Sequence, residues 1–175
     1  MRTFIALELP EEFVGELAQT ARVLSSSVEG RFMPRSNYHV TLAFLGEIHE
    51  DEARLAMDAI DEACQDIGAV GLSCNGLGTF GRAHDATLWL GLDPNQGLSE
   101  LAASVRAELT ARGVGFDNKP FRPHITLARR ARIPRGILSD LPFPAPVAVS
   151  RVTLFRSTLS KDGATYKPIY TVNLG

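Results

Sequence analysis

The chain has 175 residues, enough for one sizeable domain or for two small lobes that share a core. Hydrophobic residues make up 45% and charged residues 22%, as in an ordinary globular protein, and the net charge of −2 does not indicate nucleic-acid or membrane binding. No stretch approaches the roughly 20 apolar residues of a membrane helix. The two cysteines, Cys64 and Cys74, are too few for a disulfide framework and lack metal-type spacing. We therefore expect a cytoplasmic protein with reduced thiols and no membrane attachment.

In the first half, apolar and polar residues predict alternating strands and helices. Pro10 ends a strand, and acidic residues follow it in the first turn of a helix whose apolar stripe is Phe13, Leu17, Ala21 and Leu24. A second amphipathic helix has Leu55, Ala59 and Ala63 on one stripe. The predicted elements are a strand at 3–9, a helix from 11 to about 27, an extended piece at 31–34, a strand at 38–45, a helix at 51–66 and a glycine-interrupted strand at 70–80.

The second half repeats the order of the first. Residues 88–94 align with residues 4–10 at an offset of 84 (88 − 4), and a helix with Leu98, Leu101, Val105 and Leu109 on its apolar stripe follows. Residues 120–127 end in His-Ile-Thr-Leu, which matches the earlier His-Val-Thr-Leu segment at an offset of 85 (124 − 39). A Pro-rich loop at 133–146 precedes two final strands, 147–159 and 166–174, joined by the turn Lys161-Asp162-Gly163.

These elements predict an α+β fold, because strands are interspersed with helices and the chain ends look antiparallel. We expect one bilobed domain spanning residues 1–175, with an internal duplication whose halves are about 1–85 and 86–175. Chance recurrence of strand–helix–strand order would explain the matching elements, but it does not explain the repeated tetrapeptide.

The repeated segment is His-x-Thr-Leu, at His39–Leu42 and again at His124–Leu127. Each copy lies in a predicted strand, where side chains alternate between faces. His39 and Thr41 therefore share a face opposite Val40, Leu42 and Phe44. His124 and Thr126 likewise share a face, so two halves can bring two imidazoles and two hydroxyls to one cleft.

Such a cleft suits phosphoryl chemistry near neutral pH. A neutral histidine can remove a proton from an attacking water while a protonated histidine donates one to the leaving oxygen. The threonine hydroxyls can donate hydrogen bonds to phosphate oxygens. No metal or other cofactor is needed, and neither His-Glu-x-x-His nor Cys-x-x-Cys occurs. We expect His49 at the surface and His84 in a loop.

Arg129 belongs to a local basic cluster with Arg122, Arg130, Arg132 and Arg135. It lies five residues after His124, so strict strand alternation would place it on the opposite face unless the strand bulges near Ala128. Both readings remain open for Arg129, a phosphate contact and a solvated loop residue. For Arg132 and Arg135 a solvated loop is favoured. The aromatic residues Phe80, Trp89, Phe116 and Phe121 can stack a nucleobase or simply belong to the core.

The chain resembles the two-histidine (2H) phosphoesterase superfamily, and most closely the RNA 2′,3′-cyclic phosphodiesterases, also called 2′-5′ RNA ligases. The resemblance runs nearly end to end and is carried by the segments 2–7, 39–46, 88–90, 123–129 and 154–157. It implies a bilobed α+β fold in which two antiparallel sheets line a central cleft and helices lie outside.

The resemblance also implies a reaction, the hydrolysis of RNA 2′,3′-cyclic phosphate ends to 2′-phosphates. His39 would be the proton donor to O3′ and His124 the proton acceptor for water, although the two near-identical motifs do not separate these roles. Thr41, Thr126 and Arg129 would bind phosphate. The expected partner is RNA with a cyclic end, or a cyclic nucleotide, and the expected state is a monomer. Reverse 2′-5′ ligation, a small cyclic-nucleotide substrate and a non-catalytic RNA-end binding module remain alternatives.

Overall fold

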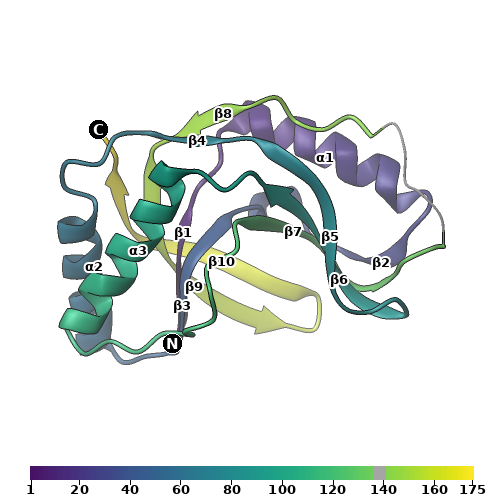
Figure 1. The fold of residues 1–175 in the computed structure, drawn as a ribbon. Coiled ribbons are helices and arrows are strands. Elements are labelled where there is room, and N and C mark those ends of the chain that lie inside the picture. Colours follow the sequence, from purple (N-terminus) through teal and green to yellow (C-terminus); the bar gives the residue numbers. More distant parts are fainter. Residues whose placement is uncertain (136–140) are drawn as a thin grey trace.

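The computed structural model describes residues 1–135 and 141–175, and it shows two curved sheets with helices on their outer sides (Figure 1). The helices are α1 (Glu11–Ser25), α2 (Glu50–Ala63) and α3 (Gln96–Ala111), with a short 3-10 turn, η1 (Arg35–Asn37). The strands are β1 (Arg2–Leu7), β2 (Glu29–Phe32), β3 (Val40–Glu47), β4 (Val70–Leu72), β5 (Cys74–Arg82), β6 (Asp85–Leu92), β7 (His124–Arg132), β8 (Val147–Val149), β9 (Arg151–Ser160) and β10 (Gly163–Asn173).

The strands form two four-stranded antiparallel sheets. We call them sheet A, in the order β10-β9-β1-β3, and sheet B, in the order β2-β7-β6-β5. A third, two-stranded sheet pairs β4 with β8. Helices α2 and α3 pack side by side at one end of the molecule, and α1 runs along the other end (Figure 1). The predicted α+β, bilobed architecture with antiparallel sheets is therefore confirmed.

The two halves of the chain exchange strands between the lobes. Sheet A contains β1 and β3 from the first half together with β9 and β10 from the second, whereas β2 and β5 join sheet B. One strand pair in each sheet matches between the halves, because β1 pairs with β3 and β6 pairs with β7, both antiparallel and both connected through a long helix. We propose that this match reflects an internal duplication within one domain.

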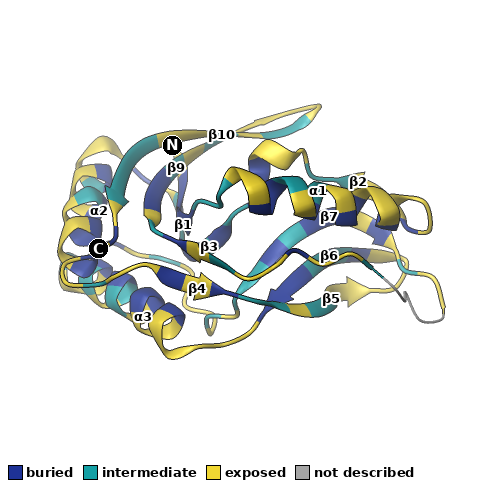
Figure 2. Cartoon of the chain, turned by 90° about the horizontal axis from the view of Figure 1, so that it is seen from above, coloured by how far each residue is buried: buried dark blue, intermediate teal, exposed yellow. Residues whose placement is uncertain are grey.

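The helices bury the faces that their apolar spacing predicts, with one exception (Figure 2). The stripes of α1 and α3 are buried in the core. In α2, Ala59 and Ala63 are buried, but Leu55 is 39% exposed, so its predicted inward placement is wrong. Ala53, Ala56 and Ile60 cover the sheet instead, since they follow the same helical face as Ala59. No described helix is both long enough and apolar enough to span a membrane.

Two predicted strands are each divided between two sheets. The segment 70–80 breaks at Ser73 into β4 and β5, and the segment 147–159 breaks at Ser150 into β8 and β9. The carbonyl groups at the breaks are not left unsatisfied, because Ser73 accepts a hydrogen bond from the Asp93 amide and Ser150 accepts one from the Leu174 amide.

The predicted end of α2 at Asp66 is too late, since Asp66 has a φ of 59° and lies beyond Ala63. Residues 136–140 of the predicted Pro-rich loop lie outside the described residues, and 133–135 and 141–146 form neither helix nor strand.

Trp89 crosses the surface of sheet B above a glycine. It lies on β6 opposite Gly78 of β5 and opposite Thr126 of β7, and a Cβ atom added to Gly78 would overlap the indole ring. Because glycine has no Cβ atom, the indole ring can occupy the space above residue 78. The centroid of the Trp89 ring then lies 5.7 Å from that of the His124 ring.

We expect Gly78→Ala to destabilise the protein by about 1–3 kcal/mol, because the added methyl group must displace the indole from a packed position. The matched control is Gly71→Ala in β4, where an added Cβ meets nothing within 4 Å. The measurement is chemical denaturation of both variants. Equal stabilities for the two would contradict the contact.

Candidate active site

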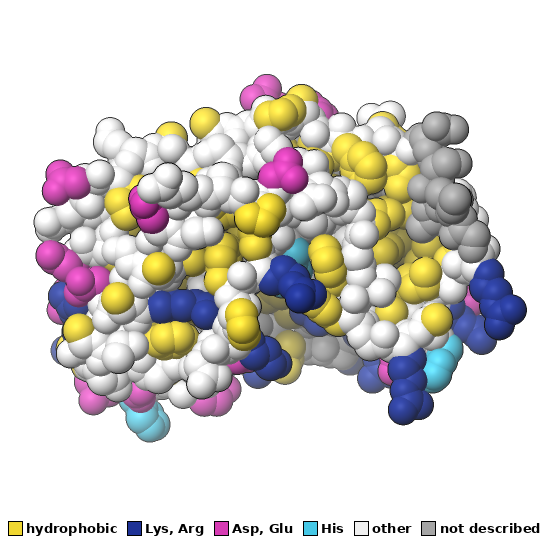
Figure 3. Space-filling view, viewed as in Figure 1, with side chains coloured by type: hydrophobic (Ala, Val, Ile, Leu, Met, Phe, Trp, Pro, Cys, Tyr) yellow, Lys and Arg dark blue, Asp and Glu magenta, His cyan; other side chains and the backbone are white. Residues whose placement is uncertain are grey.

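A cleft of about 580 Å³ lies between sheets A and B and contains both His-x-Thr motifs. Figure 3 shows that basic side chains gather around a hollow near the centre of one face, with a histidine visible inside it. The described residues that line the cleft are Arg2, Phe4, Met33, Asn37, His39, Thr41, Phe44, Phe80, Thr87, Asp117, Lys119, His124, Thr126, Arg129, Ser157, Leu159, Ala164 and Tyr166. The structure therefore brings together all five site residues predicted from the sequence.

His39 is fixed at the start of β3 by two hydrogen bonds. Its Nδ1 atom lies 2.7 Å from the carbonyl oxygen of Asn37, and its Nε2 atom lies 2.9 Å from the hydroxyl of Thr41. A carbonyl oxygen only accepts, so Nδ1 carries the proton, and in the neutral ring Nε2 accepts from Thr41. Asn37 is buried and is itself held by a 2.9 Å bond from its amide to the carbonyl of Ala164 in β10.

His124, the first residue of β7, has the same backbone contact. Its Nδ1 atom lies 2.6 Å from the carbonyl oxygen of Arg122, again two residues earlier. The bond assigns the proton to Nδ1 by the same argument, so Nε2 is the nitrogen left for chemistry. Nε2 of His124 has no hydrogen-bond partner within the described ranges.

Aromatic rings pack against both imidazoles. His39 lies 4.7 Å from the ring centroid of Phe4 and 5.3 Å from that of Tyr166. His124 lies 5.4 Å from the centroid of Phe80, in an edge-to-face arrangement. These rings exclude water from the cleft walls and restrict rotation of the imidazoles.

Burial and nearby positive charge lower the pKa values of both histidines. Burial lowers the pKa of His39 to about 4, against the opposing effect of the Asn37 hydrogen bond, and the charges of His124 and Arg129 lower it further. Burial is also the main cause of the lowered pKa of His124, with Arg122 and Arg129 contributing. Both rings are therefore neutral near pH 7 in the absence of a bound anion, and an anion between them would raise both pKa values.

A bulge in β7 brings Arg129 into the cleft. In the register with β6, Leu88 pairs with Ala128 while Trp89 pairs with Thr126, so β7 has one extra residue, Leu127. Leu127 and Ala128 are both fully buried, which interrupts the alternation of faces. Of the two readings of Arg129, the structure supports the one in which its side chain lines the cleft.

The same bulge occurs in β3 and corrects one prediction. Ile5 pairs with Ala43 and Ala6 pairs with Thr41, so Leu42 is the extra residue. Phe44 was predicted to point away from the cleft with Val40, but the bulge turns it into the cleft, where it occupies the position that Arg129 has in the other sheet.

The β3 bulge is supported by Arg106 of α3, a residue that sequence reasoning did not single out. Its Nε atom donates to the carbonyl of Leu42 at 3.0 Å, and its Nη1 atom donates to the carbonyl of Lys119 at 2.7 Å. Burial lowers the pKa of the Arg106 guanidinium. An arginine on the expected outer side of an amphipathic helix gives no sequence signal for this contact, because its partners are backbone groups far away in the chain.

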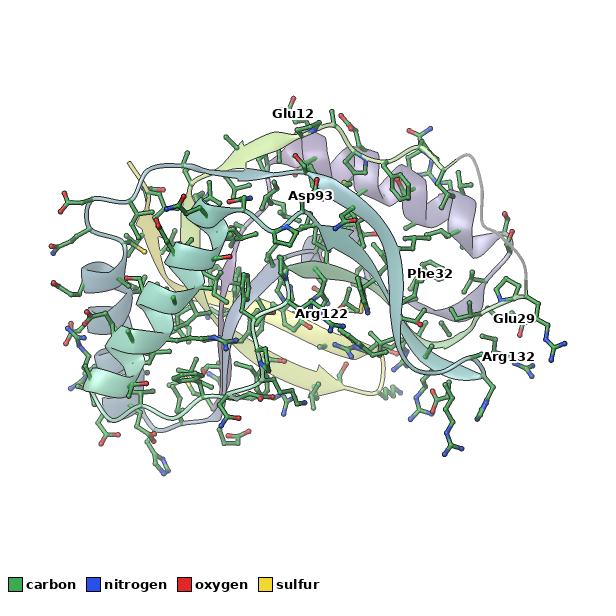
Figure 4. The ribbon with its side chains drawn as sticks, viewed as in Figure 1. Glu12, Glu29, Phe32, Asp93, Arg122 and Arg132 are labelled. Atoms are coloured by element: carbon green, nitrogen blue, oxygen red, sulfur yellow. The ribbon has the colours of Figure 1, made fainter. Side chains whose placement is uncertain are left out.

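The remaining predicted candidates lie elsewhere. His49 is an exposed cap of α2, and His84 lies in the exposed turn between β5 and β6. Arg132 lies at the far end of sheet B near Glu29, away from Arg122, as Figure 4 shows. Within residues 1–135 and 141–175 no group of three or more His, Cys, Asp or Glu side chains is arranged to hold a metal ion.

A second hollow of about 690 Å³ continues from the cleft on the His124 side. Its lining is mostly apolar and aromatic, and Arg122 lies over the ring of Phe80 at 5.7 Å. Its described lining residues are Thr41, Phe44, Phe80, Pro94, Ser99, Arg106, Asp117, Lys119, Pro120, Phe121, Arg122, Pro123 and His124. A flat aromatic ring fits such a lining, since faces of Phe and of guanidinium groups both stack.

The chain is similar to known proteins over nearly its whole length. Residues 9–160 match the family model described as the 2′-5′ RNA ligase superfamily. The chain is 30% identical to the RNA 2′,3′-cyclic phosphodiesterase of Thermotoga maritima over 97% of its length and 94% of the relative. It superimposes on a crystal structure of a Thermus thermophilus protein with a TM-score of 0.85 at 27% identity, covering 99% and 98% of the two chains. For LigT from E. coli complexed with 3′-AMP, the TM-score is 0.81 at 28% identity, covering 99% and 97%. The chain therefore belongs to the 2′-5′ RNA ligase superfamily.

Proposed function

We propose that this protein hydrolyses the 2′,3′-cyclic phosphate ends of RNA to 2′-phosphates by acid–base catalysis with two histidines. The observation that carries the proposal is that His39 and His124, each held through Nδ1 by a backbone carbonyl, line one cleft with the threonines of their motifs. The name of the Thermotoga relative supports the same substrate class.

In this mechanism the phosphorus atom lies between the two Nε2 atoms. An in-line displacement needs a base on the side of the attacking water and an acid on the side of the leaving O3′. By likeness to the family, His124 is the base and His39 the acid. Cleavage of the P–O3′ bond forms the 2′-phosphate, and the proton taken from water by His124 balances the proton given to O3′ by His39.

The threonines and Arg129 stabilise the charge on the phosphate. Thr126 presents a hydroxyl donor beside the His124 ring, and Arg129 supplies a positive charge from the bulged part of β7. The Thr41 hydroxyl donates to Nε2 of neutral His39, and protonation of that nitrogen frees the hydroxyl to donate to the phosphate. The negative charge of the substrate also raises the pKa of His39, so the acid becomes protonated when the phosphate binds.

The second hollow is the proposed place of the terminal nucleobase. It adjoins His124, and the stacked pair of Phe80 and Arg122 supplies a flat cationic surface. E. coli LigT, a similar structure, was crystallised in complex with 3′-AMP, which supports nucleotide binding by this chain. Reverse 2′-5′ ligation follows when a 5′-hydroxyl replaces water. A monomeric state and a cytoplasmic location stay predictions.

The decisive experiment is product analysis on RNA ending in a 2′,3′-cyclic phosphate, with EDTA present. A 2′-phosphate product supports the proposal. A 3′-phosphate product would place the leaving group on the wrong oxygen. Recovery of unchanged RNA would favour a non-catalytic end-binding module, and turnover of cyclic nucleotides without turnover of RNA would favour a small-molecule enzyme.

Removing either imidazole should abolish most turnover. We expect His39→Ala and His124→Ala each to lower kcat by about 10²–10⁴-fold, because each removes one proton-transfer group. The double variant should be little worse than either single variant, since the two groups act in one step. The matched control is His84→Ala in the exposed turn, which should retain wild-type turnover. Near-normal turnover by either single variant would refute the assignment.

The pH dependence should be bell-shaped and should lie on the acidic side. His39 must be protonated and His124 neutral, so kcat/KM falls above the pKa of the acid and below that of the base. Both free-enzyme pKa values are lowered, so we expect the optimum of kcat/KM below pH 6.5. The optimum of kcat should lie at higher pH, because the bound phosphate stabilises both imidazolium forms. An optimum of kcat/KM above about pH 7 would be inconsistent with this electrostatic picture.

A further inference from the structure

The cleft contains more positive charge than the proposed chemical step uses, because Arg2 is present in addition to Arg129. Arg2 lines it from sheet A and Arg129 lines it from sheet B. Across the described part of the chain, neither guanidinium has a carboxylate partner within 4.0 Å. Asp117, a carboxylate in the cleft lining, already lies 3.6 Å from the ammonium group of Lys119. This surplus is local, since the whole chain has a net charge of −2.

Arg2 belongs to a polar row across sheet A, which continues on β3 with Glu47, opposite Arg2. The Glu47 carboxylate lies 3.2 Å from the N-terminal ammonium group of Met1 and does not line the cleft. On its other side Arg2 pairs with Ser157 of β9, which pairs with Tyr166 of β10. Residues directly opposite one another in a sheet share a face, and the side chains of Arg2, Ser157 and Tyr166 line the cleft. Neither hydroxyl of the row has a hydrogen-bond partner among the described residues, so the row presents donors that the protein itself does not use.

The row adjoins the His-x-Thr motif of β3, because the centroid of the Tyr166 ring lies 5.3 Å from that of His39. Thr41 pairs with Ala6, and Phe44 pairs with Phe4, one same-face row nearer to Arg2. The guanidinium of Arg2 leans back over the Phe44 ring, 4.8 Å from its centroid. The backbone of Arg2 lies two same-face rows, about 13–14 Å, from the Ala6–Thr41 pair, and the lean of its side chain over Phe44 shortens the separation of the guanidinium from Thr41.

The row also lies away from the nucleobase pocket. Arg2, Ser157, Tyr166 and Arg129 line the cleft but not the second hollow next to His124. If the terminal base of an RNA strand occupies the second hollow, the nucleotide before it would lie toward the row. Burial raises the pKa of Tyr166, and the positive charges of Arg129 and Arg2 offset part of that rise. Both guanidinium groups therefore lie near the Tyr166 hydroxyl.

We propose that Arg2, Ser157 and Tyr166 form a second phosphate subsite, which binds the internal phosphodiester preceding the cyclic end. The preferred substrate is then an RNA strand of at least two nucleotides, not a cyclic mononucleotide. This inference rests on the proposed function and specifies its substrate. Arg129 faces the row from the opposite sheet and adds positive charge between the two phosphate positions.

Three substrates separate the possible sources of the second phosphate. They are a nucleoside 2′,3′-cyclic phosphate, the same compound with a 5′-phosphate, and a dinucleotide with a 2′,3′-cyclic end. We expect the wild-type protein to favour the dinucleotide over the nucleoside cyclic phosphate by about tenfold in kcat/KM, the effect of one charge-assisted phosphate contact. Arg2→Gln should bring this ratio close to one, and Tyr166→Phe should lower it while keeping the ring against His39.

Salt dependence gives an independent readout of the same contact. In a plot of log kcat/KM against log salt concentration, the dinucleotide should show a slope about 0.7 steeper than the nucleoside cyclic phosphate. Arg2→Gln should remove the difference. The control is Arg156→Gln, which deletes a positive charge at the neighbouring register position of β9, where Arg156 pairs with Thr3 and lines a groove outside the cleft.

Each outcome has one interpretation. If the wild type hydrolyses all three compounds equally, or if Arg2→Gln lowers all three rates by one factor, the second subsite is wrong and the proposed reaction stands. If the 5′-phosphorylated mononucleotide is hydrolysed with the same kcat/KM as the dinucleotide, and the nucleoside cyclic phosphate with a lower one, the subsite binds a terminal phosphate. The inference that the substrate is an RNA strand is then wrong. If no compound is hydrolysed while thermal unfolding of the wild type is cooperative, the proposed function itself fails.

Discussion

The site depends on a backbone constraint that occurs twice. In each motif the histidine donates from Nδ1 to the carbonyl oxygen two residues earlier, at 2.7 Å for His39 and 2.6 Å for His124. The bond fixes the tautomer and the ring orientation at once, because the carbonyl can only accept. Nε2 is therefore the unprotonated nitrogen of each neutral ring, in His39 bonded to the Thr41 hydroxyl and in His124 without a partner among the described residues. The main chain orients the rings, as a carboxylate does in other histidine sites. Because the acceptor is main chain, the identity of residues 37 and 122 is free to differ, as Asn37 and Arg122 do.

The bulges in β3 and β7 turn this pair of strands into a site with two different walls. A regular strand would place His and Thr on one face and the fifth residue after His on the other, and only the extra residue brings that fifth residue into the cleft. One sheet then presents Phe44 and the other Arg129. The bulge in β3 leaves the carbonyl of Leu42 available, and Arg106 satisfies it from α3. The packing of a helix is thus coupled directly to the position of Thr41.

The sequence was sufficient for those parts of the fold and site that depend on local periodicity. It located the helical stripes of α1 and α3, and the facing of His39 with Thr41 follows from the two-residue period of a strand. It did not locate the breaks at Ser73 and Ser150, because a strand that passes from one sheet to another keeps its apolar alternation. It placed Phe44 on the wrong face and left Arg129 open, since a bulge is set by pairing with a partner strand. Arg2, Tyr166 and Arg106 entered the site only through contacts between distant segments.

The electrostatics of the cleft link the pKa values of the two histidines to the binding of the proposed phosphate substrate. Burial among Phe4, Tyr166, Phe80 and Trp89 disfavours the charged form of either ring, and the guanidinium groups add to this effect. In the proposed mechanism the same groups favour a phosphate, whose negative charge offsets both the burial of His39 and the smaller effect of the positive charges near it. Proton uptake by His39, the proposed acid, would therefore be linked to occupancy of the site. A cleft with weaker positive charge would hold a histidine of higher pKa but would bind the phosphate less tightly. Strong phosphate binding and a protonated histidine are therefore compatible only when the anion is bound.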